Sequence, residues 1–164
     1  MTEIDLQEAI KRSIQTEKNA MLFYQAAAGQ MTDAGARAVF ELLAREEREH
    51  AAQFFALYQG DAIPSFTAFM EQPALTDSSW MQELLLTAND TFTERKAMAL
   101  ALEKEKKLEQ SLREMAAKVT DPAVRQVYEA NARSTSHHFQ LIESEYARLM
   151  GMVHETDIDT FVRE

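Results

Sequence analysis

The residues whose types and spacing could do chemistry are glutamates and histidines that interrupt apolar stripes of helical period. Glu17 lies in one such stripe, Glu47 and His50 in a second, Glu105 in a third and His138 in a fourth. Burying a carboxylate is costly unless it is paired or binds a metal ion. Glu47 and His50 are three residues apart, so on one helix both side chains reach the same ion. The five residues therefore predict a metal site.

The ligand types narrow the choice of metal. Carboxylate and imidazole ligands suit iron or manganese, and zinc also accepts them. The chain contains no cysteine, which excludes disulfides, thiolate catalysis, Cys-ligated zinc and iron–sulfur clusters. The nine methionines are better explained as core filling than as a copper site.

Long helices must position these side chains, because only four Gly and three Pro occur in 164 residues. Sheets would need turn residues far more often. Asp121 followed by Pro122 is a typical helix start. The apolar period predicts four main helices and one short one, at about residues 5–28, from 32 or 33 onward, 93–118, 122–151 and, for the short helix, 80–86.

The two halves of the chain repeat each other. A shift of 88 residues aligns residues 9–59 with 97–147 and gives 13 identities in 51 positions without a gap. The identities include Glu17 with Glu105 and His50 with His138. Two unrelated Ala- and Glu-rich helix pairs could also match by composition, but a duplicated helix pair explains the matches better.

This organisation predicts one all-α domain over residues 1–164. Its parts are repeat 1 at about 5–59, a crossover at 60–90, repeat 2 at about 93–150 and a tail at 151–164. Two helix hairpins joined by a long crossover form a ferritin-like four-helix bundle.

Charge and hydropathy exclude other classes. The 17 basic and 27 acidic residues give a net charge of −10, which argues against nucleic acid and anionic membranes as partners. The longest apolar run covers six residues, 97–102, against about 20 for a membrane span. The acidic first residues show no secretory signal, so we expect a cytoplasmic protein.

These motifs resemble those of the ferritin-like diiron-carboxylate proteins, and among them the rubrerythrins, over about residues 5–150. They are Glu17 with Tyr24 seven residues later, the segment 44–50 (AREEREH), Glu105, and His138. The resemblance implies two iron ions. One would be held by Glu17, Glu47 and His50, and the other by Glu105, His138 and the counterpart of Glu47.

One implied ligand is missing, because the 88-residue shift places Thr135 opposite Glu47. In the family this glutamate bridges the two metals, so we expect the second metal position to be weakened most. Glu109, one turn after Glu105, is a candidate substitute, and Asn131 is a weaker one.

No role is assigned to the neighbouring Glu46 and Glu49, which fit a solvated helix face. Tyr24 and Tyr128 lie near the predicted site. Hydrogen bonding to the site stays open for both, and packing in the core is favoured.

Three functions remain open. The first is a diiron protein that reduces peroxide or dioxygen. The second is a non-catalytic protein that binds or stores iron or another divalent metal ion in a partly degraded site. The third is a bundle with a structural role whose site has decayed. We place the first above the second.

Partners follow from the same resemblance. Full-length rubrerythrins carry a Cys-ligated rubredoxin domain, which a cysteine-free chain cannot form, so any electron donor is expected to be a separate protein. Relatives of this type commonly dimerise. The apolar pairs at 22–23 and 54–55 cannot all face one core, so we expect a homodimer.

Overall fold

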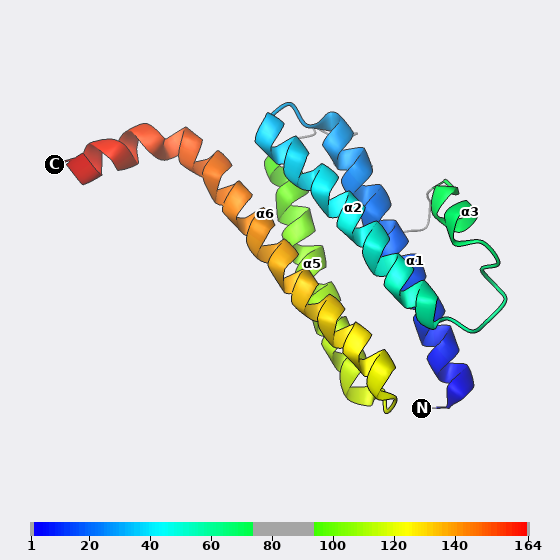
Figure 1. The fold of residues 1–164 in the computed structure, drawn as a ribbon. Coiled ribbons are helices and arrows are strands. Elements are labelled where there is room, and N and C mark those ends of the chain that lie inside the picture. Colours follow the sequence, from blue (N-terminus) through cyan, green and yellow to red (C-terminus); the bar gives the residue numbers. More distant parts are fainter. Residues whose placement is uncertain (1, 74–93, 164) are drawn as a thin grey trace.

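The computed structural model describes residues 2–73 and 94–163, with side chains for all of these except Ile4 and residues 152–163. Four long helices lie side by side, and a short helix flanks them (Figure 1). No strand occurs within the described residues. The helices are α1 (Glu3–Gln30), α2 (Ala34–Leu57), α3 (Phe66–Glu71), α5 (Glu94–Lys118) and α6 (Pro122–Arg163).

The helices begin where side chains can cap them. The Asp33 carboxylate accepts a hydrogen bond from the backbone N–H of Ala36 at 2.9 Å. At the start of α6, Asp121 accepts from the N–H groups of Ala123 and Val124 at 2.9 and 3.4 Å. Each cap satisfies donors that a helix leaves unpaired at its start, and both starts were predicted from the sequence.

The long helices form two antiparallel hairpins, α1 with α2 and α5 with α6, which meet mainly along α2 and α6. The loops of the two hairpins are built alike. Arg37 donates to the carbonyl of Met31 at 2.5 and 3.1 Å, and Arg125 donates to that of Val119 at 2.6 and 3.0 Å. The two arginines, like the two carbonyls, are 88 residues apart, so the sequence repeat is also a structural one.

The apolar stripes of all four long helices face one core. Large aromatic rings fill it on either side of the glutamate and histidine positions. The Tyr24 and Phe40 rings pack edge to face with centroids 5.1 Å apart, and those of Phe54 and Tyr128 lie 4.8 Å apart. Such packing fixes the height and rotation of each helix, and therefore the direction of its polar residues.

The first part of the crossover contains a helix that the sequence pattern did not predict. Ser65 caps α3 by accepting from Ala68 N–H at 3.2 Å, and Phe66 packs on Phe55 of α2 at 5.3 Å. A six-residue helix depends on such tertiary contact, which a period search cannot detect. The short helix expected at residues 80–86 lies outside the described residues.

The predicted end of the last helix at Gly151 is wrong, because α6 continues to Arg163 and runs past the other helices (Figure 1). A glycine within a helix costs about 1 kcal/mol relative to alanine but does not by itself terminate it. Gly151 has no positive φ, which would mark a terminating glycine. Among the described helices, none combines the length and apolar character that crossing a membrane requires.

Candidate metal centre

The core places five ionisable side chains at one level of the bundle. α1 supplies Glu17, α2 supplies Glu47 and His50, α5 supplies Glu105 and α6 supplies His138. None of the five is more than 5% exposed. These are the five residues that the sequence singled out, and each of the four long helices contributes at least one.

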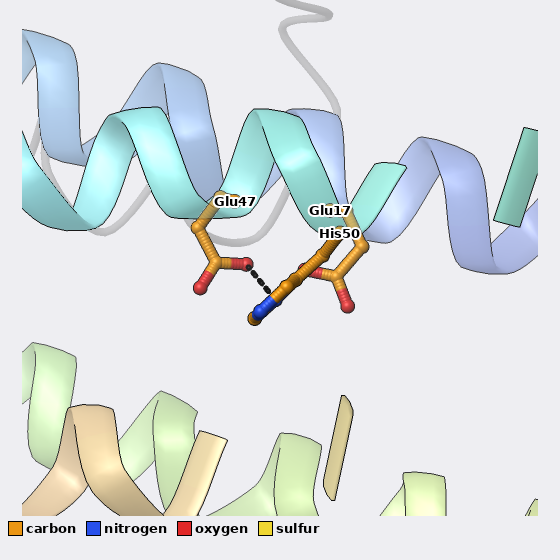
Figure 2. A group of neighbouring side chains, drawn as sticks. All are labelled: Glu17, Glu47 and His50. Atoms are coloured by element: carbon orange, nitrogen blue, oxygen red, sulfur yellow. Dashed lines mark ion pairs between the residues drawn. The ribbon is translucent and has the colours of Figure 1, made fainter. Parts of the chain in front are cut away.

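The five side chains form two overlapping groups. The ligand atoms of Glu17, Glu47 and His50 all lie within 4.8 Å of one another, and so do those of Glu47, Glu105 and His138. Figure 2 shows the first group projecting from α1 and α2 toward the other hairpin. Because Glu47 belongs to both groups, the two groups are candidate ion positions that overlap at one shared carboxylate.

Several inward-facing atoms of these side chains have no hydrogen-bond partner. They are Glu17 Oε2, Glu47 Oε2, Glu105 Oε2 and His50 Nδ1; Glu47 Oε1 and His138 Nδ1 also form no aligned hydrogen bond, although they face each other across 2.8 Å. Buried polar atoms are nearly always paired, so a cluster of unpaired ones needs an explanation. Carboxylate oxygens and imidazole nitrogens converging on one space are what a divalent cation coordinates, and the residues present therefore fit a metal.

The imidazoles turn one nitrogen toward this space. His138 Nδ1 lies 2.8 Å from Glu47 Oε1 and 3.9 Å from Glu105 Oε1. His50 Nδ1 lies 3.7 Å from Glu17 Oε2 and 3.8 Å from Glu47 Oε2. The two rings stack 5.3 Å apart at 14° to each other. Both imidazoles thus present Nδ1 to the centre.

The opposite nitrogen of each imidazole is held from outside the centre. His50 Nε2 lies 2.9 Å from Ser134 Oγ on α6, and His138 Nε2 lies 3.3 Å from Glu46 Oε1 on α2. Such outer partners fix the ring and its tautomer, leaving the other nitrogen for a metal. Glu46, which the sequence pattern indicated only as part of a solvated helix face, is the repeat counterpart of Ser134. This correspondence is the sequence signal that could have pointed to its contact with His138.

A tyrosine supports one carboxylate from within the core. The buried Tyr24 hydroxyl donates to Glu105 Oε1 at 2.5 Å, so the less favoured of the two expectations for Tyr24, a hydrogen bond to the site, is the correct one. Its repeat counterpart is Leu112, which has no hydroxyl to offer Glu17. Tyr128 instead shares a 2.8 Å hydrogen bond with Ser13.

The three other positions considered as ligands differ in where their side chains lie. Thr135 is fully buried and its hydroxyl is unpaired, as expected for a residue in the position of a lost ligand. Asn131 is also buried; it donates to Gln53 at 3.0 Å and to the Val127 carbonyl at 2.8 Å. Glu109 is not brought to the centre.

The Glu109 side chain is 28% exposed and pairs with Arg113 at 2.8 Å. Its position one turn after Glu105 carries it around the helix toward solvent. The structure therefore does not support its predicted role as the substitute ligand.

Burial and mutual repulsion shape the acidity of the carboxylates. Burial and then the neighbouring charge of Glu47 raise the pKa of Glu17 well above its usual value. The same two causes raise the pKa of Glu105. Burial also opposes the charge on Glu47, but its contacts with Glu17 and the two imidazoles outweigh burial and lower its pKa. Glu47 is thus the anion around which the others are arranged.

The pKa values of the two imidazoles are raised, which favours their charged form. Burial disfavours their charged form, yet contacts with Glu17 and Glu47 raise the pKa of His50 to about 10. Contacts with Glu105 and Glu47 likewise raise that of His138 to about 11. Without a metal ion, protons on the imidazoles balance the buried carboxylates, and a cation would displace them.

Comparison with known proteins agrees with this geometry. The family model described as Rubrerythrin matches residues 8–146, which include every residue of the centre. The chain belongs to the rubrerythrin family. The curated proteins gave no match, and neither did the solved structures. Rubrerythrin membership and the buried cluster together support the ferritin-like fold and a metal centre made of glutamate and histidine.

Proposed function

We propose that this rubrerythrin-family chain is a non-haem diiron protein that reduces peroxide or dioxygen. The observation that carries the proposal is the pair of buried groups that share Glu47. Glu17 and His50 would hold one ion, Glu105 and His138 the other, and Glu47 both. Bound iron supplies reversible one-electron changes at each position, which is the chemistry that reducing peroxide or dioxygen requires.

Neighbouring side chains fix the orientation of the proposed ligands. Tyr24 fixes one oxygen of Glu105, while Ser134 and Glu46 keep the two imidazoles turned inward. Because the side chains are already in place and nearly dry, little reorganisation would accompany a change of charge in the centre. Iron is favoured by the family, and manganese and zinc suit the same ligands.

The missing glutamate leaves this centre with one carboxylate fewer than a six-ligand centre has. Three carboxylates carry three negative charges, whereas two divalent ions carry four positive ones. The repeat aligns Thr135, which is buried and neutral, with Glu47, and a fourth carboxylate there would restore the balance. We infer that the ion held by Glu105 and His138 binds more weakly than the ion held by Glu17 and His50.

A metal count tests the proposal. Purified full-length protein is titrated with Fe(II) without oxygen and is then exposed to peroxide. We expect two irons per chain and a rapid rise in ferric absorbance. Glu47→Gln should abolish binding of the second ion, whereas Glu49→Gln, a matched change at an exposed position on the same helix, should bind like the parent.

A second function, binding or storage of one divalent ion without turnover, is favoured by Thr135. One tightly bound ion with no oxidation of added Fe(II) by peroxide would support it over the diiron proposal. If no ion binds, and Glu47→Ala leaves the melting temperature unchanged, the bundle has only a structural role.

Two partners belong to the same proposal. The chain has no cysteine with which to build a rubredoxin-type iron site, so reducing equivalents would come from a separate electron-donor protein. We also propose a homodimer, which equilibrium sedimentation of the full chain would detect. A monomer at micromolar concentration would contradict it.

A further inference from the structure

A cavity of about 310 Å³ opens between α1 and α5 and reaches Glu17. It lies on the side of the bundle away from the main contact between the hairpins, which runs along α2 and α6. Its volume is roughly ten times the 30 Å³ share of one water molecule. Peroxide, about the size of two waters, would leave most of it unfilled.

The cavity exists where the repeat is broken. Tyr24 occupies core space in its own half and reaches Glu105 with its hydroxyl. Its counterpart Leu112 lines the cavity beside Glu17. Leucine is smaller than tyrosine and has no hydroxyl, so volume and a hydrogen-bond partner are both missing on this side.

The wall of the cavity is largely apolar. Leu108, Leu112 and Met115 line it. Three of the hydroxyls that also line it, those of Ser13, Thr16 and Tyr128, bond within the protein. Ser13 donates to the Ala9 carbonyl at 3.0 Å and accepts from Tyr128 at 2.8 Å. Thr16 donates to the carbonyl of Arg12 at 2.9 Å. An apolar group would therefore find a matching surface along the part of the wall formed by Leu108, Leu112 and Met115.

Cations line the same cavity. They are Arg12, Lys104 and Lys107, and Lys107 also pairs with Glu103 at 2.9 Å. Three basic residues gathered at one opening stand out on a chain of net charge −10. Ligand sites typically combine an apolar wall with a few polar groups that fix orientation. Here the charged groups are three cations and the buried Glu17, so an anion would be favoured at the basic residues, and guanidinium matches the geometry of a carboxylate.

We propose that this cavity binds a small organic carboxylate with an apolar tail. The head group lies at Arg12, and the tail lies against Leu112 and Met115, next to the Glu17 side of the centre. Binding itself does not require the metal. A regulatory or substrate role for the ligand does rest on the proposed function, since two divalent ions facing three carboxylates leave an excess positive charge that favours a nearby anion.

Octanoate is a suitable probe, titrated by calorimetry into metal-free and into zinc-loaded full-length protein. We expect saturable binding to one site in both forms. Octanol, which lacks the charge, and acetate, which lacks the tail, should each bind roughly tenfold or more weakly, because the charge-assisted contact and the apolar burial are both needed. Equal binding of octanol and octanoate would overturn the proposal, as would the absence of octanoate binding.

Variants locate the site. Arg12→Glu should weaken octanoate roughly tenfold. Lys106→Glu makes a comparable charge change at an exposed position of α5 that does not line the cavity, and it should bind within about twofold of the parent. Leu112→Trp should fill the cavity and abolish binding, with its fold checked by circular dichroism. Full affinity in Arg12→Glu, or in a folded Leu112→Trp, contradicts the proposal.

The metal count separates this inference from the proposed function. Two bound irons without octanoate binding would overturn the inference alone. Octanoate binding in a chain that takes up no metal would overturn the diiron proposal and leave the carboxylate site standing.

Discussion

At the scale of single residues, the two repeats differ at three positions around the centre. The pairs are Glu47 with Thr135, Glu46 with Ser134, and Tyr24 with Leu112. Each difference changes what surrounds an ion: the number of carboxylates, the charge of the group behind an imidazole, or the support of a carboxylate. A duplicated scaffold has therefore become an asymmetric centre, and each difference can be reversed by one substitution.

Thr135→Glu should raise the affinity for the second metal ion. The new carboxylate would enter the buried position where the repeat places a ligand and would balance the excess positive charge, so we expect a gain of at least roughly tenfold, since even outer partners of metal ligands are worth that much. Anaerobic calorimetry with Fe(II) measures it. Thr135→Gln, similar in size but neutral, is the control. If Thr135→Glu binds no more metal than the parent, the placement of Thr135 in the centre is wrong.

Glu46→Gln should weaken one ion position selectively. Glu46 lies behind His138, and removing its charge makes that imidazole a poorer ligand, at a cost of roughly 10- to 100-fold in affinity. The His50 position, backed by Ser134, should change little. A Co(II) titration followed by absorbance resolves the two steps, with Glu49→Gln as the control. Equal weakening of both steps would show that Glu46 acts on the whole fold.

At the scale of elements, much was readable from the sequence because the signals are local. Apolar period and caps placed the four long helices, and the stripes identified the five inward-facing glutamates and histidines. Contacts between elements were not readable. The support of His138 by Glu46 and of Glu105 by Tyr24 depends on helix rotation, which no single stripe reveals.

Two errors at this scale have separate physical causes. Gly151 does not end the last helix, because glycine only weakens a helix and α6 passes through it. The helix α3 went unpredicted because a short helix depends on the surface it packs against.

Asp121→Ala tests the element that carries His138. The Asp121 carboxylate caps α6 through two backbone N–H groups, and losing such a cap costs about 1 kcal/mol. We expect a lower urea midpoint with an unchanged slope, measured by circular dichroism on the metal-free protein. Glu129→Ala, an exposed site inside the same helix, is the control. Equal stability of Asp121→Ala and the parent would mean that the Pro122 start suffices without the cap.

At the scale of the whole molecule, the acidity of the chain is partly internal. Three of its 27 acidic residues face one another in the core. Without metal, their stabilisation depends on protons held by the two imidazoles, whose pKa values are raised to about 10 for His50 and about 11 for His138. With metal, the same nitrogens must be deprotonated to act as ligands. Proton and metal therefore compete for one centre.

The stability of the metal-free protein should consequently fall as the solution becomes alkaline. A histidine pKa raised by folding stabilises the fold fully below its unfolded value of about 6.5, and this contribution is lost as pH rises through about 10 and 11. Urea unfolding at pH 7 and pH 9.5 measures the loss. Metal-loaded protein should retain its stability at pH 9.5, because its ligand nitrogens carry no proton, and should release metal as the pH falls instead.

The matched control is His50→Gln combined with His138→Gln, which removes both titrating groups and should flatten the pH dependence of the metal-free protein. If this variant still loses stability at alkaline pH, groups other than the two histidines cause the loss. A metal-free parent that is equally stable at both pH values would mean that the imidazoles do not hold the protons that balance Glu47, and that the buried carboxylates are neutralised in another way.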